Sequence, residues 1–204
     1  MTDPRTLKEL SPPELEALGS LASRAAARAA QSLGLLLGLR DGDLHAQPFR
    51  VGGAQDVEEA LGPKQAVAVM FRLAGGVNGR FWLVAPLPDM LVLAARLLGN
   101  PSRPPTALDE NTRGALAEAG NVVSSSFINV FGDTLRQVCY PSVPDVRLAP
   151  TSLLSRLALD ATDVVGLMRV RGDTNPPVHA TFLWSPDPLS LSALVRAIRQ
   201  RQSA

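Results

Sequence analysis

The chain of 204 residues is poor in the side chains that most metal and redox sites require. It contains one cysteine, Cys139, and two histidines, His45 and His179. One chain can therefore build neither a disulfide framework nor a zinc site of cysteine and histidine. Cys139 lies between Val138 and Tyr140 in a stretch that predicts a strand, so we expect a buried, unreactive thiol rather than a nucleophile.

Aromatic residues and an excess of charge of either sign are also scarce. Phe, Trp and Tyr make up 4% of the chain, and the formal net charge is +1. We expect no nucleic-acid partner, because there are few stacking platforms and no basic footprint. The longest apolar runs, residues 33–37 and 90–98, are too short or too interrupted to cross a bilayer, and the amino terminus has no signal-peptide pattern. We therefore expect no membrane partner and a cytoplasmic location.

The apolar content of 46% is sufficient for one sizeable core. We expect a single domain over residues 1–204 that consists of two similar halves, residues 11–99 and 106–202. A shift of 101 positions aligns residues 17–21 with residues 118–122, and such self-similarity indicates a duplication. The proline-rich residues 100–105 predict a linker between the halves.

Periodicity and turn signals predict the same order of elements in each half: a long helix, three strands and a closing helix. Ser11 and Glu14 form a capping box for the first helix, which should end near residue 38, and Thr106 with Asp109 marks the start of the second. Strands are expected at residues 44–51, 65–73 and 79–85, and at residues 137–146, 162–171 and 178–184. The closing helices are expected at residues 89–98 and after a cap at Ser185. This order indicates an α+β fold in which two long helices cover a mostly antiparallel six-stranded sheet.

The second long helix, residues 108–131, has one apolar and one polar face. At 100° per residue, Gly114, Glu118, Asn121 and Ser125 fall together on the side that faces away from the core. The flanking Gly114 and Ser125 are small, so another protein could approach this face closely. The apolar arc comprises Ala115, Leu116, Ala119, Val122, Val123, Phe127 and Val130.

This pattern resembles the CheC/CheX/FliY family of bacterial chemotaxis phosphatases, in which a long helix carries Glu-x-x-Asn and a proline follows. Glu118 and Asn121 fill the motif, and Pro144 follows after twenty-two intervening residues. The resemblance implies a phosphatase that hydrolyses the aspartyl phosphate of a CheY-type response regulator. Asn121 would orient the attacking water, and Glu118 would pair with the regulator's active-site lysine. It also implies no cofactor of the chain's own, because the Mg²⁺ is held by the regulator.

The chain departs from the family pattern at two places. Gly114 stands where the fuller signature has Asp or Ser, which predicts reduced activity. In the first half, Ala17 and Ser20 replace Glu and Asn, so we expect a single intact site in a CheC-like member. Arg24 and Arg28 follow this degenerate copy and form either a docking patch for an acidic partner or an ordinary solvated face.

Other interpretations of the same residues stay open. Glu and Asn three positions apart are common on solvated helices, and Pro144 is equally an ordinary edge proline. Gly120 lowers helix propensity by roughly 1 kcal/mol, which we interpret as a functional choice. The alternative function is a non-catalytic adaptor that binds a response regulator or a CheD-like receptor deamidase. A structural role related to flagellar switch proteins is a third hypothesis, for which we would expect an additional carboxy-terminal domain.

Overall fold

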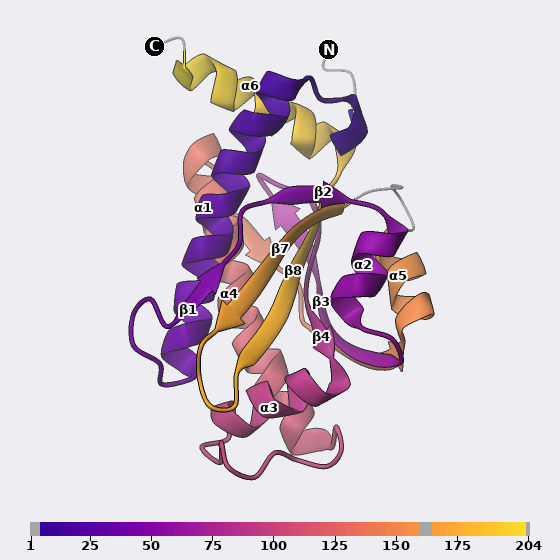
Figure 1. Ribbon diagram of the computed structural model, residues 1–204. Coiled ribbons are helices and arrows are strands. Elements are labelled where there is room, and N and C mark those ends of the chain that lie inside the picture. Colours follow the sequence, from indigo (N-terminus) through magenta and orange to yellow (C-terminus); the bar gives the residue numbers. More distant parts are fainter. Residues whose placement is uncertain (1–4, 160–164, 203–204) are drawn as a thin grey trace.

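The computed structural model describes residues 5–159 and 165–202 (Figure 1). The helices are a 3-10 turn at Leu7–Glu9, α1 (Pro12–Leu36), α2 (Ala54–Leu61), α3 (Leu87–Leu97), α4 (Glu110–Leu135), α5 (Thr151–Leu159) and α6 (Pro188–Gln202). The strands are β1 (Leu44–Ala46), β2 (Arg50–Gly52), β3 (Gln65–Gly75), β4 (Gly79–Pro86), β5 (Cys139–Pro141), β6 (Asp145–Pro150), β7 (Val165–Gly172) and β8 (Val178–Pro186). The described helices include none that is both long and apolar enough to cross a membrane.

All the strands in residues 5–159 and 165–202 belong to one sheet, in which every pairing is antiparallel. The order is β1-β7-β8-β4-β3-β5, with β2 also on β7 and β6 also on β3. The expected α+β class, with an antiparallel sheet and two long covering helices, is confirmed. The pairing also crosses between the two halves of the chain, because β1 and β2 add to β7 while β5 and β6 add to β3.

Within the described residues the sheet has eight strands rather than six, because the first strand of each half is interrupted by a bulge. Ser142 and Asp145 pair with residues of β3 that are separated only by Phe71, so residues 143–144 stand opposite one residue. Such an insertion breaks the ladder and bends the strand.

The first half contains a bulge of the same kind. Gln47 and Arg50 pair with residues of β7 that are separated only by Met168, so residues 48–49 stand opposite one residue. Each bulge includes a proline, Pro48 or Pro144, which has no N–H to donate to a ladder.

The sheet separates two apolar clusters. The larger one lies between the sheet and the helices α1, α3, α4 and α6. In it Phe127, Phe131 and Trp184 are in mutual ring contact, and Phe81 contacts Phe127. The smaller one lies on the opposite face, under α2 and α5, around Trp82 and Leu167. Neither short helix was expected from the sequence.

Two expected boundaries also differ. Ser185 lies inside β8 and does not cap the last helix, which starts at Pro188. The strand expected at residues 162–171 begins at Val165, and residues 162–164 lie outside the described part of the chain.

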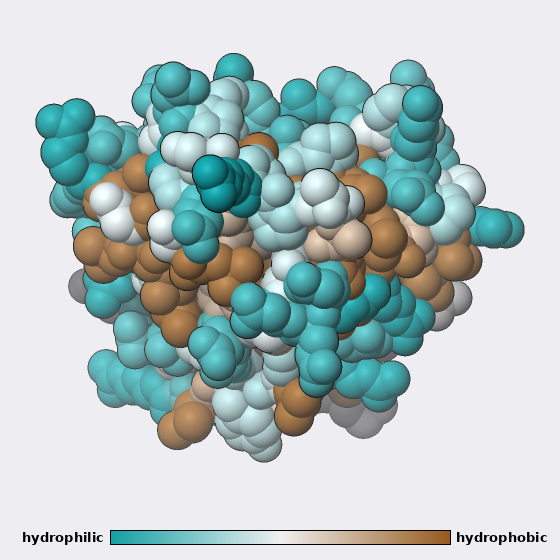
Figure 2. Space-filling view, turned by 90° about the horizontal axis from the view of Figure 1, so that it is seen from below, coloured by the Kyte–Doolittle hydropathy of each residue, from teal (hydrophilic) through white to brown (hydrophobic). Residues whose placement is uncertain are grey.

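The helices α3 and α6 lie at opposite ends of the α1–α4 pair (Figure 1). Viewed from the α3 end, apolar side chains gather in a band on the surface (Figure 2). The last turn of α1 lies at this end, and its Leu35 and Leu36 are exposed. This end of the molecule therefore presents apolar side chains to solvent.

Candidate functional site

The helix α4 is held at both ends by its own backbone chemistry. At its start, the Asp109 carboxylate accepts a hydrogen bond of 2.8 Å from the Thr112 N–H, and the bonds from Thr112 lower the pKa of that carboxyl. At its end, Arg136 adopts a left-handed conformation with φ of 55°, and its N–H bonds to the Gly132 carbonyl. The helix therefore starts and stops within a residue of these caps.

The polar face of α4 is where the periodicity places it. Gly114, Glu118 and Asn121 are exposed, and Ser125 is half-buried. The side of the helix that packs on the sheet buries Leu116, Ala119, Val123 and Phe127. Val122 was expected in the apolar arc, but it is 41% exposed. The surface next to Asn121 is therefore partly apolar.

Gly120 has a packing role that replaces the functional explanation expected from its helix propensity. It is buried, and a Cβ on it would lie 2.7 Å from Val69 Cγ1 and 3.1 Å from the Phe71 ring. Only glycine lets α4 approach β3 this closely. Gly114 lies in open space, and a Cβ there would meet no other atom within 4 Å.

Pro144 lies in the bulge between β5 and β6, on the edge strand next to β3. Phe71 links this bulge to α4, because it stands opposite residues 143–144 and also packs against Gly120. Asn121 follows Gly120 directly, so the structure brings the Pro144 bulge to the same region of the sheet as the motif helix. The sister bulge at Pro48 shows that such a proline recurs where the motif is degenerate.

In the first half, Ala17 is half-buried and Ser20 is exposed on α1. A Cβ on the neighbouring Gly19 would lie 3.2 Å from the Phe49 ring, so both long helices have a glycine at a site of close packing. Arg24 and Arg28 are exposed on the same helix.

Metal ligands do not gather in the part of the chain that the structure describes. No group of three or more His, Cys, Asp and Glu side chains there has the arrangement of a metal site. Cys139 is free and buried, as expected, and its burial raises the pKa of the thiol.

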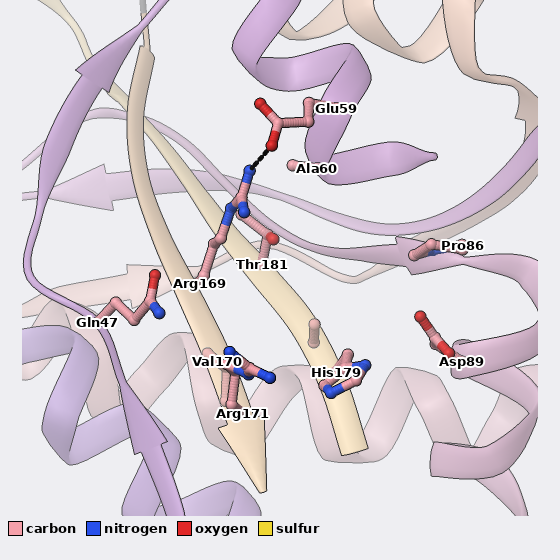
Figure 3. Close-up of a pocket in the computed structure, with 11 residues that line it drawn as sticks. Gln47, Glu59, Ala60, Pro86, Asp89, Arg169, Val170, Arg171, His179 and Thr181 are labelled. Carbon is pink, nitrogen blue, oxygen red and sulfur yellow. Dashed lines mark hydrogen bonds and ion pairs between the residues drawn. The ribbon is translucent and has the colours of Figure 1, made fainter. Parts of the chain in front are cut away.

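A groove that the sequence did not predict lies on the opposite face of the sheet, where α2 meets β7 and β8 (Figure 3). This β7–β8 groove has a volume of about 270 Å³ and is lined by Glu59, Asp89, Arg169, Arg171 and His179, among others. Burial raises the pKa of the Asp89 carboxyl. The signal in the sequence was the alternation of arginines with buried apolar residues along β7.

Comparison with known proteins bears on the α4 face. Over 83 residues the chain is 29% identical to the CheY-P phosphatase CheC of Bacillus subtilis (strain 168), and the matched stretch is 40% of each protein. The structure of Thermotoga maritima FliY superposes with a TM-score of 0.71 at 20% identity, over 95% of this chain and 100% of that one. This chain has the CheC/CheX/FliY fold. The resemblance predicted from the motif is therefore confirmed.

The CheC/CheX/FliY fold also occurs in other contexts. A chain in the crystal structure of the FliM–SpeE complex from H. pylori superposes with a TM-score of 0.66 at 10% identity, over 95% of this chain and 98% of that one. No family model matches the sequence. Because one fold carries different functions, the activity has to be argued from the residues of the site.

Proposed function

We propose that this protein is a phosphatase for the aspartyl phosphate of a CheY-type response regulator. The observation that carries the proposal is the exposed pair Glu118 and Asn121 on a helix that is fixed against the sheet by Gly120. The similarity of this chain to the CheY-P phosphatase CheC supports the choice of substrate class. The chain spans 40% of that relative in the alignment, so substrate and partner are part of the proposal.

Asn121 would orient the attacking water. A carboxamide offers a donor and an acceptor on one planar group, so it can hold a water in line with the phosphorus without taking a proton. The substrate is already an activated acyl phosphate, and the Mg²⁺ that neutralises its charge is supplied by the regulator. A hundredfold acceleration needs only about 2.7 kcal/mol of transition-state stabilisation.

Glu118 would dock the regulator. It stands one helical turn before Asn121 on the same exposed face, so its carboxylate can pair with a lysine of the regulator while the amide reaches the phosphoryl group. The exposed Val122 adds apolar surface beside the pair. In this arrangement Gly114 and Ser125 permit close approach, and the Pro144 bulge borders the contact.

The test measures the decay of the phosphorylated form of each response regulator of the source organism after loading with acetyl phosphate. We expect the wild-type protein to accelerate decay for one regulator. Asn121→Ala should abolish the acceleration while binding is retained, and Glu118→Ala should weaken it through lost affinity. Asn129→Ala is the matched control, because Asn129 is an exposed asparagine farther along the same helix.

The alternative is an adaptor that binds a regulator or a CheD-like protein without hydrolysing phosphate. Gly114 and the degenerate copy at Ala17 and Ser20 favour it, because both remove groups that the phosphatase pattern contains. Binding of one regulator without any change in its decay rate would reject the phosphatase and support the adaptor.

A further inference from the structure

A second groove lies across the sheet from α4, where α5 meets β3, β4 and β6. This β3–β6 groove has a volume of about 290 Å³, and its lining includes Met70, Arg72, Arg80, Trp82, Asp145 and Arg147. It is the counterpart of the β7–β8 groove, since each is built on a pair of long strands, a bulged edge strand and a short helix. The two grooves therefore provide an internal comparison.

In the β7–β8 groove the charges are matched within the chain. Arg169 donates to Glu59 of α2 at 2.7 Å (Figure 3). Asp89 faces the same space as Arg171 and His179. Two carboxylates thus offset the two arginines of this groove.

The β3–β6 groove lacks this balance. Glu59 of α2 lines the β7–β8 groove, whereas the residue of α5 that lines the β3–β6 groove is the apolar Leu157. Within the described residues, Arg72 is hydrogen-bonded only through its main chain. Arg147 is paired with Asp145 at 2.7 Å, and that aspartate is the one carboxylate among the described residues of the lining.

Arg80 adds a third guanidinium with a free donor. Its Nη1 donates to the Leu157 carbonyl at 2.9 Å, which fixes the side chain. Its Nη2 is buried, and no acceptor in the described part of the chain bonds to it. A buried donor without a partner is unfavourable, so a ligand acceptor that bonds to it would be favoured.

The other walls are apolar. Trp82 and Met70 come from the central strands β4 and β3. The side chain of Trp82 is almost fully buried. A volume near 290 Å³ exceeds what a bare phosphate or carboxylate fills and falls at the small end of ligand-binding pockets. Guanidinium groups recognise phosphate through paired N–H donors and stack on flat rings.

We propose that the β3–β6 groove binds a small organic phosphate of about mononucleotide size. Its phosphate lies among Arg72, Arg80 and Arg147, and its flat body lies against Trp82 and Met70. The site is on the opposite face of the sheet from Glu118 and Asn121, so it does not depend on the proposed phosphatase activity.

Titration of the full-length protein with AMP, followed by ¹H–¹⁵N NMR, tests this proposal. We expect saturable shifts at the Trp82 indole N–H and at the amides of Arg72 and Val143, with weaker binding as salt is added. Arg72→Ala should weaken binding at least tenfold, whereas Arg169→Ala, the matched change in the other groove, should not alter it. Arg72 is exposed, so its removal should leave the fold intact.

Adenosine and inorganic phosphate separate the two parts of the ligand. Both should bind at least tenfold more weakly than AMP. Equal binding of inorganic phosphate would overturn the assignment of an organic body, and equal binding of adenosine would overturn the role of the arginines. Absence of shifts at the groove, or unchanged affinity in Arg72→Ala, would reject the site.

Discussion

Two glycines on α4 have opposite surroundings. A Cβ on Gly120 would lie 2.7 Å from Val69 Cγ1, whereas one on Gly114 would meet nothing within 4 Å. We expect Gly120→Ala to lower the free energy of unfolding by about 1 to 3 kcal/mol, because overpacking outweighs the gain in helix propensity. Gly114→Ala should raise it by about 0.5 to 1 kcal/mol. Urea unfolding of both variants gives the comparison, and equal effects would show that α4 does not press on β3 at Gly120.

Gly114 also bears on the proposed phosphatase activity. If the missing side chain limits activity, Gly114→Ser should increase the rate of regulator dephosphorylation. One additional hydrogen bond is worth about 0.5 to 1.5 kcal/mol, which corresponds to roughly a twofold to tenfold change in rate. Gly114→Ala in the same decay assay controls for helix stability. A rate that rises equally in both variants would assign the effect to the helix and not to the hydroxyl.

At the scale of single elements, α4 ends on a strained residue. Arg136 has φ of 55°, a region in which a side chain costs about 1 to 2 kcal/mol. The substitutions Arg136→Gly and Arg136→Ala remove the same charge. The difference between their free energies of unfolding therefore reports the backbone conformation. We expect the glycine variant to be more stable than the alanine variant by about 1 kcal/mol in thermal or urea unfolding. No difference would mean that the helix end relaxes without cost.

The long helices could be predicted from the sequence because the cap and the apolar period that define each one lie within the helix itself or next to it. The Asp109 cap and the apolar period over residues 108–131 are enough to define α4 and its polar face. The short helices α2 and α5 have eight and nine residues, too few for periodicity to distinguish them from loops. The bulges could not be predicted, since their register depends on partner strands far away in the chain.

Site prediction had the same limit. Glu118 and Asn121 share a helix, so their common face was accessible from spacing alone, and their roles stay predictions. The arginines of the β3–β6 groove come from β3, β4 and β6. Only the folded sheet brings them together, and Gly120 acquires its packing role only when β3 lies beneath it.

At the scale of the whole molecule, one buried carboxylate joins the chain's first turn, α1 and α6. Glu14 has a side chain that is 3% exposed and accepts bonds from Arg5 at 2.6 and 2.8 Å and from the Ser11 N–H and hydroxyl, while Arg199 lies 2.8 Å away. The bonds from Arg5, followed by those from Ser11 and the charge of Arg199, hold the pKa of Glu14 well below its ordinary value of 4.5. The folded protein therefore keeps this group ionised when the unfolded chain would protonate it.

The resulting pH dependence has a definite sign. The contribution of Glu14 to stability is fully present above pH 4.5 and is lost as pH falls below that value toward the folded-state pKa. We expect Glu14→Gln to lower the free energy of unfolding by about 1 to 3 kcal/mol at neutral pH and to flatten its fall in acid. Glu16→Gln, an exposed neighbour, is the control. A Glu14→Gln variant with the acid sensitivity of the wild type would contradict this assignment.

The crossed strand pairing makes each half of the chain depend on the other. Because β1 and β2 complete β7, and β5 and β6 complete β3, neither half can close its own sheet edge. A free half would find the missing strands in a second copy of itself, by mutual exchange. The present chain thus has, in one polypeptide, the strand pairing that two exchanged subunits of a homodimer would have.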